Sequence, residues 1–323
     1  MISGLTFNSR QRNAFRKSLL NWYDVNRRDL PWRQTKDPYR IWISEIMLQQ
    51  TRVGAVLDHY RRFLDRFPDV ETLAKAREQS VLAAWSGLGY YRRARNLHAA
   101  AKVVSFERGG EFPRTAEGLR ELPGVGRYTS AAIASIAFDE PNAVVDGNVE
   151  RVLSRVTGRV ELSERETWTL AEEMLSRERP GDFNQAMMEL GATVCLPGEP
   201  KCLNCPVIAL CKTRGSQPTR KKEQRVSREI SLALPRKEGA VWLVQRDKSA
   251  SLMPGMWELP EISANGRSPE ARFKHSILNT DYNVSIYLVE EPGVNGCWIA
   301  TRRLSRTALT GLARKVLRHF SLI

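Results

Sequence analysis

The chain has 323 residues, of which 42% are hydrophobic and 27% charged, and a formal net charge of +14. This composition predicts a globular protein of about two domains. It argues against a membrane protein, since no apolar run approaches the ~20 residues of a span. The start lacks the apolar segment of a secretory signal, so we expect a cytoplasmic, nucleoid-associated protein. The positive charge favours a polyanionic partner, although charge alone does not distinguish DNA, RNA and an anionic membrane.

Residues 8–212 carry the apolar periodicity of helices. Segments 37–67, 70–89 and 92–108 each combine an apolar stripe with charged faces. We therefore predict an all-α domain in this part of the chain.

One carboxylate lies inside an apolar helical run. "IWISEIMLQQT" surrounds Glu45 with apolar residues, and Gln49 follows four residues later on the same predicted face. Burial raises the pKa of a carboxyl group, which suits a general acid near neutral pH. The alternative is that Glu45 lies on an exposed stripe.

The run "ELPGVGRYTS" predicts a tight turn between two helices. Thr115 is a predicted N-cap of the first helix, and Pro123 ends it. Gly124 and Gly126 permit positive φ angles in the connection. The second helix then begins with exposed N–H groups that suit a phosphate, unless this is an ordinary helix–helix turn.

A second carboxylate, Asp146, occurs in "AVVDGNVERVLSR". It could cap a helix that starts near Val149, or act as an active-site anion, and the two roles are compatible. One protonated acid and one carboxylate form the pair that cleaves glycosidic bonds.

Four cysteines follow in "CLPGEPKCLNCPVIALC": Cys195, Cys202, Cys205 and Cys211. This spacing predicts a metal site, because zinc and iron–sulfur clusters both accept four thiolates. Two disulfides are disfavoured in a reducing cytosol. The spacing does not choose between zinc and [4Fe–4S].

The chain changes character after the cysteines. Residues 212–228 hold seven basic residues and one acidic residue, which predicts a linker over 213–228. Alternating apolar residues then predict strands at 229–235, 239–246 and 282–290, and an amphipathic helix at 307–320. The second domain, 229–323, is thus predicted to be mixed α and β.

Together these motifs resemble a known family. "LPGVGRYT", "VDGNV" and the four cysteines resemble the helix–hairpin–helix DNA glycosylases with an iron–sulfur cluster. "LPWR", "SEIMLQQT", "GLGYYRRARNLH" and "NQAMMELGA" narrow the resemblance to adenine DNA glycosylases of the MutY type. It spans essentially the whole chain. It implies a [4Fe–4S] cluster and a helical domain 1–212, with a six-helix part at about 29–138 and an iron–sulfur part from the N-terminal helix and 139–212.

The resemblance also implies the reaction. The family removes adenine mispaired with 8-oxoguanine or guanine in double-stranded DNA, and we expect a monomer. Glu45 is expected to protonate the extruded adenine, Asp146 to stabilise the sugar cation or its adduct, and Tyr128 and Asn148 to hold acid, sugar and water. The expected DNA- and base-binding residues of this part are Arg33, Gln49, Gln50, Tyr90, Leu122, Gly124, Val125, Gly126 and Arg127.

Tyr128 separates two chemistries. Endonuclease III relatives have a lysine at this place, whose amine forms a Schiff base and drives strand cleavage. A phenol forms no imine, so we expect a monofunctional glycosylase.

The second domain resembles the Nudix-fold domain of this family, but it lacks the R-E-x-x-E-E core of Nudix hydrolases. We therefore expect it to bind DNA and not to hydrolyse nucleotides. The family's lesion-recognition loop aligns with Phe273, Lys274, His275 and Ser276, where Lys274 replaces a serine. The alternative is a basic loop that holds DNA without recognising the lesion.

Two further functions compete with adenine removal. One is an endonuclease III-like pyrimidine glycosylase with lyase activity, which Tyr128 and the second domain disfavour. The other is a non-catalytic DNA-binding protein. Binding alone would need none of Glu45, Asp146, Tyr128 and Asn148, so their presence disfavours it.

Overall fold

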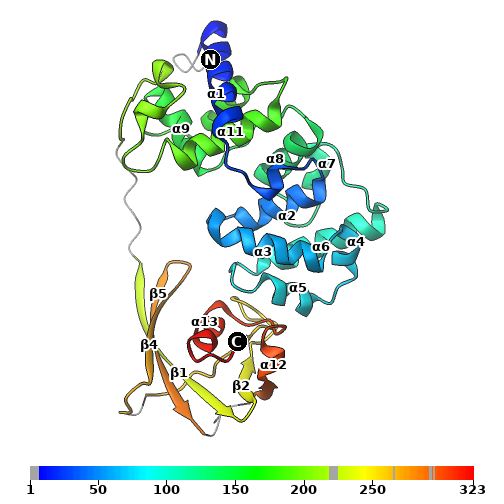
Figure 1. Cartoon of the computed structure of the whole chain (residues 1–323), viewed down its shortest axis with the longest axis vertical. Coiled ribbons are helices and arrows are strands. Elements are labelled where there is room, and N and C mark those ends of the chain that lie inside the picture. The colour runs from blue at the N-terminus through cyan, green and yellow to red at the C-terminus, as the bar shows by residue number, and fades with distance from the viewer. Residues whose placement is uncertain (1–6, 218–224, 265, 291–292, 294) are drawn as a thin grey trace. The chain divides into compact units, whose positions relative to one another are not determined.

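The computed structural model describes residues 7–217, 225–264, 266–290, 293 and 295–323. Its helices are α1 (Ser9–Asn26), α2 (Pro38–Leu48), α3 (Val53–Arg66), α4 (Val70–Lys75), α5 (Glu78–Trp85), α6 (Arg92–Lys102), α7 (Ala116–Arg120), α8 (Arg127–Phe138), α9 (Gly147–Thr157), α10 (Glu164–Met174), α11 (Pro180–Thr193), α12 (Thr301–Leu304) and α13 (Gly311–His319). Its strands are β1 (Val226–Lys237), β2 (Ala240–Gln245), β3 (Trp257–Glu258), β4 (Ala271–Ile277), β5 (Thr280–Val289) and β6 (Cys297–Ala300) (Figure 1). No helix in these ranges combines the length and apolarity needed to cross a bilayer.

The chain divides into two compact units. One comprises Met1–Val53 and Val103–Lys221, and the other comprises Gly54–Lys102 and Lys222–Ile323. The second unit therefore contains helices α3 to α6 as well as the sheet, and the predicted six-helix part is divided between both units. The domain boundaries drawn from the sequence stay a prediction, and part of the predicted linker, 218–224, lies outside the described residues.

The helical prediction for the first two thirds of the chain is confirmed, but long periodic segments are broken into shorter helices. The predicted helix over 37–67 ends at Leu48 and starts again at Val53. Between them, Gln50 has a φ of 54°. This left-handed backbone ends the helix, because L-residues cannot continue a right-handed helix through it.

The glycine turn is only partly as expected. Thr115 caps α7 by accepting a hydrogen bond from the Gly118 N–H, and Gly124 has a φ of 75°. Gly126, however, has a φ of −89° and an extended backbone as the N-cap of α8, so only Gly124 adopts the positive φ that both glycines permit. One left-handed residue suffices to reverse the chain here.

A core of buried apolar residues joins α1, α9, α10 and α11. It includes Phe15 on α1, Val152 on α9 and Leu190 on α11. Phe183 of α11 lies against Phe15, with ring centroids 6.3 Å apart. This core supports the two helices, α9 and α11, that border the candidate site.

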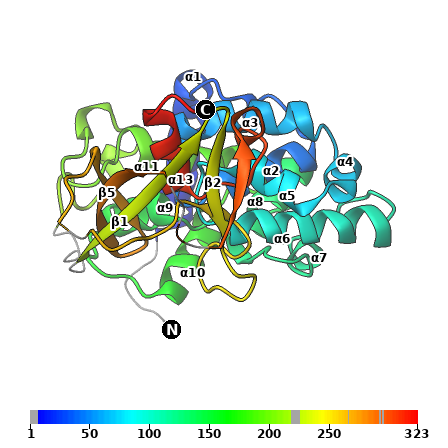
Figure 2. The same ribbon diagram turned by 90° about the horizontal axis from the view of Figure 1, so that it is seen from below.

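In the second unit, the described strands form a six-stranded sheet in the order β3-β2-β1-β5-β4, with β6 paired to β2. β1 and β5 are parallel, and the other pairs are antiparallel. Figures 1 and 2 show α13 against this sheet, where Val316 and Leu317 enter its apolar core. The predicted mixture of strands and a C-terminal helix is confirmed, although β1 begins at Val226, three residues before the predicted start.

Candidate active site

Glu45 lies on α2, which begins at Pro38 and is capped by the Asp37 carboxylate. The side chain is buried, with an exposed fraction of 5%, so the exposed-stripe alternative is wrong. Burial raises the pKa of Glu45 to about 7, and the charge of Asp146 raises it as well. The Tyr128 hydroxyl and the charge of Arg33 act in the opposite direction. Glu45 therefore has the protonation behaviour of a general acid at neutral pH.

Tyr128 lies in the first turn of α8 and contacts this acid directly. Its hydroxyl donates to Glu45 Oε2 over 2.9 Å and lies 3.3 Å from Met188 Sδ. Burial of the hydroxyl, with the charge of Glu45, raises the pKa of Tyr128 well above 10. The phenol thus stays protonated and fixes the orientation of the Glu45 carboxyl group.

Replacing Tyr128 by Phe should shift the pH dependence of catalysis. In the wild type the hydrogen bond from Tyr128 lowers the pKa of Glu45. Loss of this bond should therefore raise that pKa and move the alkaline limb of the rate profile to higher pH. Single-turnover base release between pH 5 and 9 measures this shift. Tyr287→Phe, in strand β5, is the control and should leave the profile unchanged. A shift to lower pH in Tyr128→Phe would contradict this assignment.

Asp146 is the N-cap of α9. Its Oδ1 accepts from the backbone N–H groups of Asn148 and Val149 over 2.9 and 2.8 Å, and its Oδ2 accepts from Asn148 Nδ2 over 2.8 Å. The predicted cap is confirmed, with the helix starting at Gly147. Since the charge of Asp146 acts on Glu45 and Tyr128, the structure brings the two carboxyl groups and the phenol together.

Two residues that the sequence did not indicate hold Asn148 in place. Arg151 donates from Nη2 to Asn148 Oδ1 over 2.8 Å and to the Gly191 carbonyl over 2.6 Å, and from Nε to the Cys195 carbonyl over 2.8 Å. A Cβ atom on Gly191 would lie 2.5 Å from Asn148 Cβ. The close approach of α9 and α11 therefore requires glycine there, and Arg151 connects the site to the cysteine segment.

Arg33, whose charge acts on Glu45, is held by a buried carboxylate. Arg33 Nη2 lies 2.8 Å from Glu189 Oε2, and Arg28 bonds both Glu189 oxygens over 2.7 Å. Burial raises the pKa of Glu189, but the hydrogen bonds from both arginines outweigh it and lower this pKa to about 2. Glu189 was not predicted, because its partners lie more than 150 positions away in the sequence.

The predicted DNA-binding residues are distributed over both units. In the first, Gln49 donates from Nε2 to Thr129 Oγ1 over 3.1 Å, and Gln50 is exposed. Tyr90 belongs to the second unit, where the residue is 45% exposed and its φ is 47°. An exposed aromatic ring on left-handed backbone is costly without a function, so it supports a binding role without identifying the ligand.

In the glycine turn, Leu122 and Val125 are buried, so their side chains support the turn and are not exposed to a ligand. Gly124 and Gly126 are exposed. The Arg127 guanidinium lies 3.8 Å from the centroid of the Trp168 ring. The turn thus presents exposed backbone at the start of α8, as a phosphate site requires.

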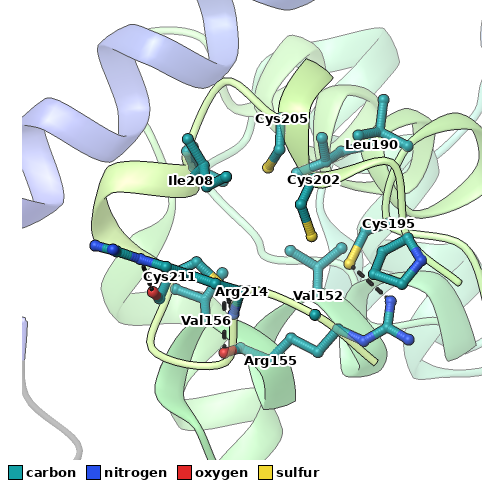
Figure 3. A pocket seen from close by; sticks show the side chains of 14 residues that line it. Val152, Arg155, Val156, Leu190, Cys195, Cys202, Cys205, Ile208, Cys211 and Arg214 are labelled. Carbon is teal, nitrogen blue, oxygen red and sulfur yellow. Dashed lines mark hydrogen bonds between the residues drawn. The ribbon is translucent and has the colours of Figure 1, made fainter. Parts of the chain in front are cut away.

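The four cysteines line one hollow of about 390 Å³, part of it open to solvent (Figure 3). Arg155 donates from Nη1 to Cys195 Sγ over 3.3 Å, and the Cys211 thiol donates to the Arg155 carbonyl over 3.4 Å. Within the described residues, no three His, Cys, Asp or Glu side chains converge as ligands of a single ion. The four sulfurs surround this hollow, which is where a shared metal group would be held.

The four cysteines can act as thiolate ligands only if a bound cation stabilises their negative charge. Burial, with the charges of the neighbouring cysteines, raises the pKa of Cys205 to about 11. A metal group compensates this cost because it stabilises thiolates directly. The buried guanidinium of Arg155 adds positive charge beside Cys195. The four cysteines, with Arg155 beside Cys195, therefore fit a metal group that is bound by negatively charged thiolates.

The predicted lesion-recognition loop is wrong in its local structure, because Phe273 to Ser276 lie in strand β4. Their backbone pairs with β5 in register, and Lys274 lies opposite Asn283. Lys274 is exposed, whereas the Ser276 hydroxyl donates to Asp281 Oδ1 over 2.5 Å. The alternation of apolar and polar residues in "ARFKHSI" is typical of a strand, in agreement with this structure.

The chain is similar to known DNA-repair glycosylases. A family model described as HhH-GPD superfamily base excision DNA repair protein matches residues 43–177. The chain is 49% identical over 236 residues to the adenine DNA glycosylase of Mus musculus, covering 69% of this chain and 44% of that protein. It is 32% identical over 351 residues to the adenine DNA glycosylase of Schizosaccharomyces pombe, covering 86% of this chain and 76% of that protein.

Among solved structures, a thermostable thymine-DNA glycosylase is similar with a TM-score of 0.59 and 34% identity, over 64% of this chain and 97% of that chain. This chain spans less than half the length of the mouse protein. The helical part has the HhH-GPD glycosylase fold, and the mixed sheet is an addition to it. By its similarity to the S. pombe protein across most of both chains, the chain belongs to the adenine DNA glycosylase family within the HhH-GPD superfamily.

Proposed function

We propose that this protein is an adenine DNA glycosylase of base excision repair that releases adenine paired with 8-oxoguanine or guanine. The observation that supports it most is the buried Glu45 carboxyl group, whose pKa is about 7, held by the Tyr128 hydroxyl and acted on by the charge of Asp146. The adenine substrate is proposed from the similarity to adenine DNA glycosylases, and the reaction is proposed from the geometry of this site.

The groups divide the reaction between them. Cleavage of the N-glycosidic bond leaves electrons on the base and positive charge on the sugar. Glu45 supplies a proton to a ring nitrogen of the extruded adenine, N7 by the family resemblance. The Asp146 carboxylate, oriented by the first turn of α9, stabilises the sugar cation until a water molecule adds to it and loses a proton, which gives the abasic site. Asn148 keeps that carboxylate in place through its side-chain amide.

One base-release assay tests this proposal. Duplexes with A:8-oxoG, A:G and a thymine glycol are incubated with the full chain, and the free bases are separated and quantified. Release of adenine from the first two duplexes is expected. Release of thymine glycol alone would favour the endonuclease III-like alternative, and binding without release of any base would favour a non-catalytic protein.

We expect the abasic product strand to remain intact. Tyr128 places a phenol where a lyase has an amine, so no imine to the sugar can form. The measurement is denaturing electrophoresis without alkali, together with borohydride trapping, and a bifunctional glycosylase serves as the positive control. A trapped covalent complex with this chain would refute the monofunctional assignment.

We also propose that Cys195, Cys202, Cys205 and Cys211 hold a [4Fe–4S] cluster. The four sulfurs around one hollow support a shared metal group, and the family resemblance favours a cluster over a single zinc ion. When bound, such a cluster supplies structural cross-linking and electron-transfer capacity. The cysteine segment then fixes the Cys195 carbonyl, which Arg151 uses to hold Asn148.

The cluster predicts a defined metal content. Purified chain should contain about four iron and four sulfide ions and show the broad visible absorbance of iron–sulfur proteins. Cys205→Ser should reduce the iron content and lower the thermal stability, since it removes one of the four proposed ligands. Cys297→Ser is the matched control and should change neither. Stoichiometric zinc in place of iron would refute the assignment.

For the second unit, we propose a Nudix-like domain that contributes to lesion recognition without hydrolysing nucleotides. The exposed Lys274 on β4 is available to a carbonyl or phosphate, whereas the Ser276 hydroxyl is bonded to Asp281. Comparing A:8-oxoG with A:G turnover in the wild type and in Lys274→Ala plus Ser276→Ala decides between recognition and simple DNA holding. We further propose a monomer located in the cytoplasm with the nucleoid.

A further inference from the structure

A loop and a helix from distant parts of the sequence meet in the second unit. The loop follows α5 and carries Tyr90, and the helix is α13 near the C-terminus. The Leu309 carbonyl, just before α13, accepts hydrogen bonds from Ser86 Oγ over 2.8 Å and from Tyr91 Oη over 3.1 Å. Arg314 of α13 donates from Nε to Ser86 Oγ over 2.8 Å. Both lone pairs of one buried carbonyl are thus used by the same loop.

These contacts are buried. Ser86 and Tyr91 have exposed fractions of 4% and 3%, and Leu309 is fully covered. A buried carbonyl that loses its donors has no water to replace them, so breaking these hydrogen bonds costs free energy. The contacts therefore stabilise one relative position of the loop and the helix. The Tyr91 hydroxyl also accepts from the Gly87 N–H over 3.4 Å, which ties it to the loop backbone.

On the loop side, Tyr90 is held in its unusual backbone conformation. The Arg93 guanidinium lies 5.4 Å from the centroid of the Tyr90 ring and 5.5 Å from that of Trp85. Arg93 also donates to the Leu88 and Gly89 carbonyls over 3.1 and 3.3 Å. The exposed ring therefore has a defined position relative to its neighbour Tyr91.

On the helix side, α13 supports strand β4. Lys315 donates from Nζ to the Lys274 carbonyl over 2.8 Å. The ring of Phe273 packs edge-on against His319, with centroids 5.0 Å apart. An unbroken series of contacts thus runs from Tyr90 through Tyr91, Leu309 and α13 to the strand that carries Lys274.

We propose that Ser86, Tyr91 and Arg314 are positioning residues that hold Tyr90 and strand β4 at a fixed separation, so that one preformed unit recognises the base opposite the adenine. This inference rests on the proposed function for the identity of that base. The three residues touch no base themselves. They set the distance between Tyr90 and strand β4, the two groups proposed to contact the base. They should therefore affect the preference for 8-oxoguanine over guanine more than they affect the rate of the reaction at Glu45.

Two measurements on the full chain test the proposal, with Ser86→Ala plus Tyr91→Phe as the variant. The first is hydrogen exchange without DNA, in which amides of residues 86–91 and 307–314 should exchange faster in the variant. The second is the ratio of Kd values for A:G and A:8-oxoG duplexes, measured in a Glu45→Gln background so that no turnover is needed. This preference should fall about tenfold or more, since the variant loses four hydrogen bonds, two of them to the buried Leu309 carbonyl.

The control is Tyr287→Phe on β5, which removes a tyrosine hydroxyl from the same unit and leaves the three contacts in place. It should change neither exchange nor preference. If the double variant does not fold, Arg314→Met removes the Arg314–Ser86 bond from a partly exposed position and should lower the preference in the same direction.

An unchanged exchange pattern would overturn the proposal, because the contacts would then not hold the two segments together. So would an unchanged preference for 8-oxoguanine despite faster exchange. Absence of adenine release from the wild type would instead refute the proposed function. The two results are distinguishable because neither exchange nor Kd requires catalysis.

Discussion

Glu45→Gln should lower single-turnover release of adenine by about a thousandfold and leave mispair binding close to that of the wild type. General acid catalysis contributes roughly 10²- to 10⁴-fold, and an amide of the same shape cannot supply the proton. Its side chain still occupies the buried position and still accepts from Tyr128. Binding by gel shift and release by chromatography measure the two properties on the same preparation.

The pH profile provides an independent check on the same residue. In the proposed mechanism the protonated form of Glu45 is the active one, and the pKa of this residue is about 7. Base release should therefore be highest below pH 7 and fall about tenfold for each unit above it. A rate that instead rises through pH 7 would show that Glu45 acts as a base. Turnover retained in Glu45→Gln would remove it from catalysis altogether.

Asp146→Asn should lower base release by about 10²- to 10³-fold. Asparagine caps helices as well as aspartate does, so α9 should still start at Gly147. The variant removes the negative charge that faces the sugar cation, and electrostatic groups of this kind contribute a few kcal/mol. Circular dichroism and the melting temperature are the checks that the fold is kept.

The same substitution should also move the pH profile. The charge of Asp146 raises the pKa of Glu45, so its loss should lower that pKa and shift the alkaline limb to lower pH. Tyr128→Phe should shift the limb in the opposite direction. Equal shifts in both variants would indicate a general disturbance of the site in place of the two separate interactions.

The features that the sequence predicted well are local. The cap at Asp146 depends on residues two and three positions away, and Thr115 caps α7 in the same way. The apolar run around Glu45 predicted a raised pKa because burial dominates that shift. Such signals need no knowledge of which helices are neighbours.

The features that the sequence did not predict depend on distant partners. Glu189 is buried because Arg28 and Arg33 lie beside it, and no short motif records that relation. Gly191 is needed because Asn148 packs against it, a contact between residues 43 positions apart. The segment Phe273 to Ser276 is expected to be a loop from its resemblance to a family motif. Its backbone is a strand because it pairs with β5, a partner that the motif does not include.

One helix, α11, forms the shared wall of the candidate site. Its Met188 lies beside the Tyr128 hydroxyl, its Glu189 holds Arg33, and its Gly191 contacts Asn148. A local unfolding event that detaches α11 would therefore release the acid, the arginine and the amide in a single step. Heat should then abolish base release at the temperature where α11 loses its protection, even while the sheet of the second unit remains folded.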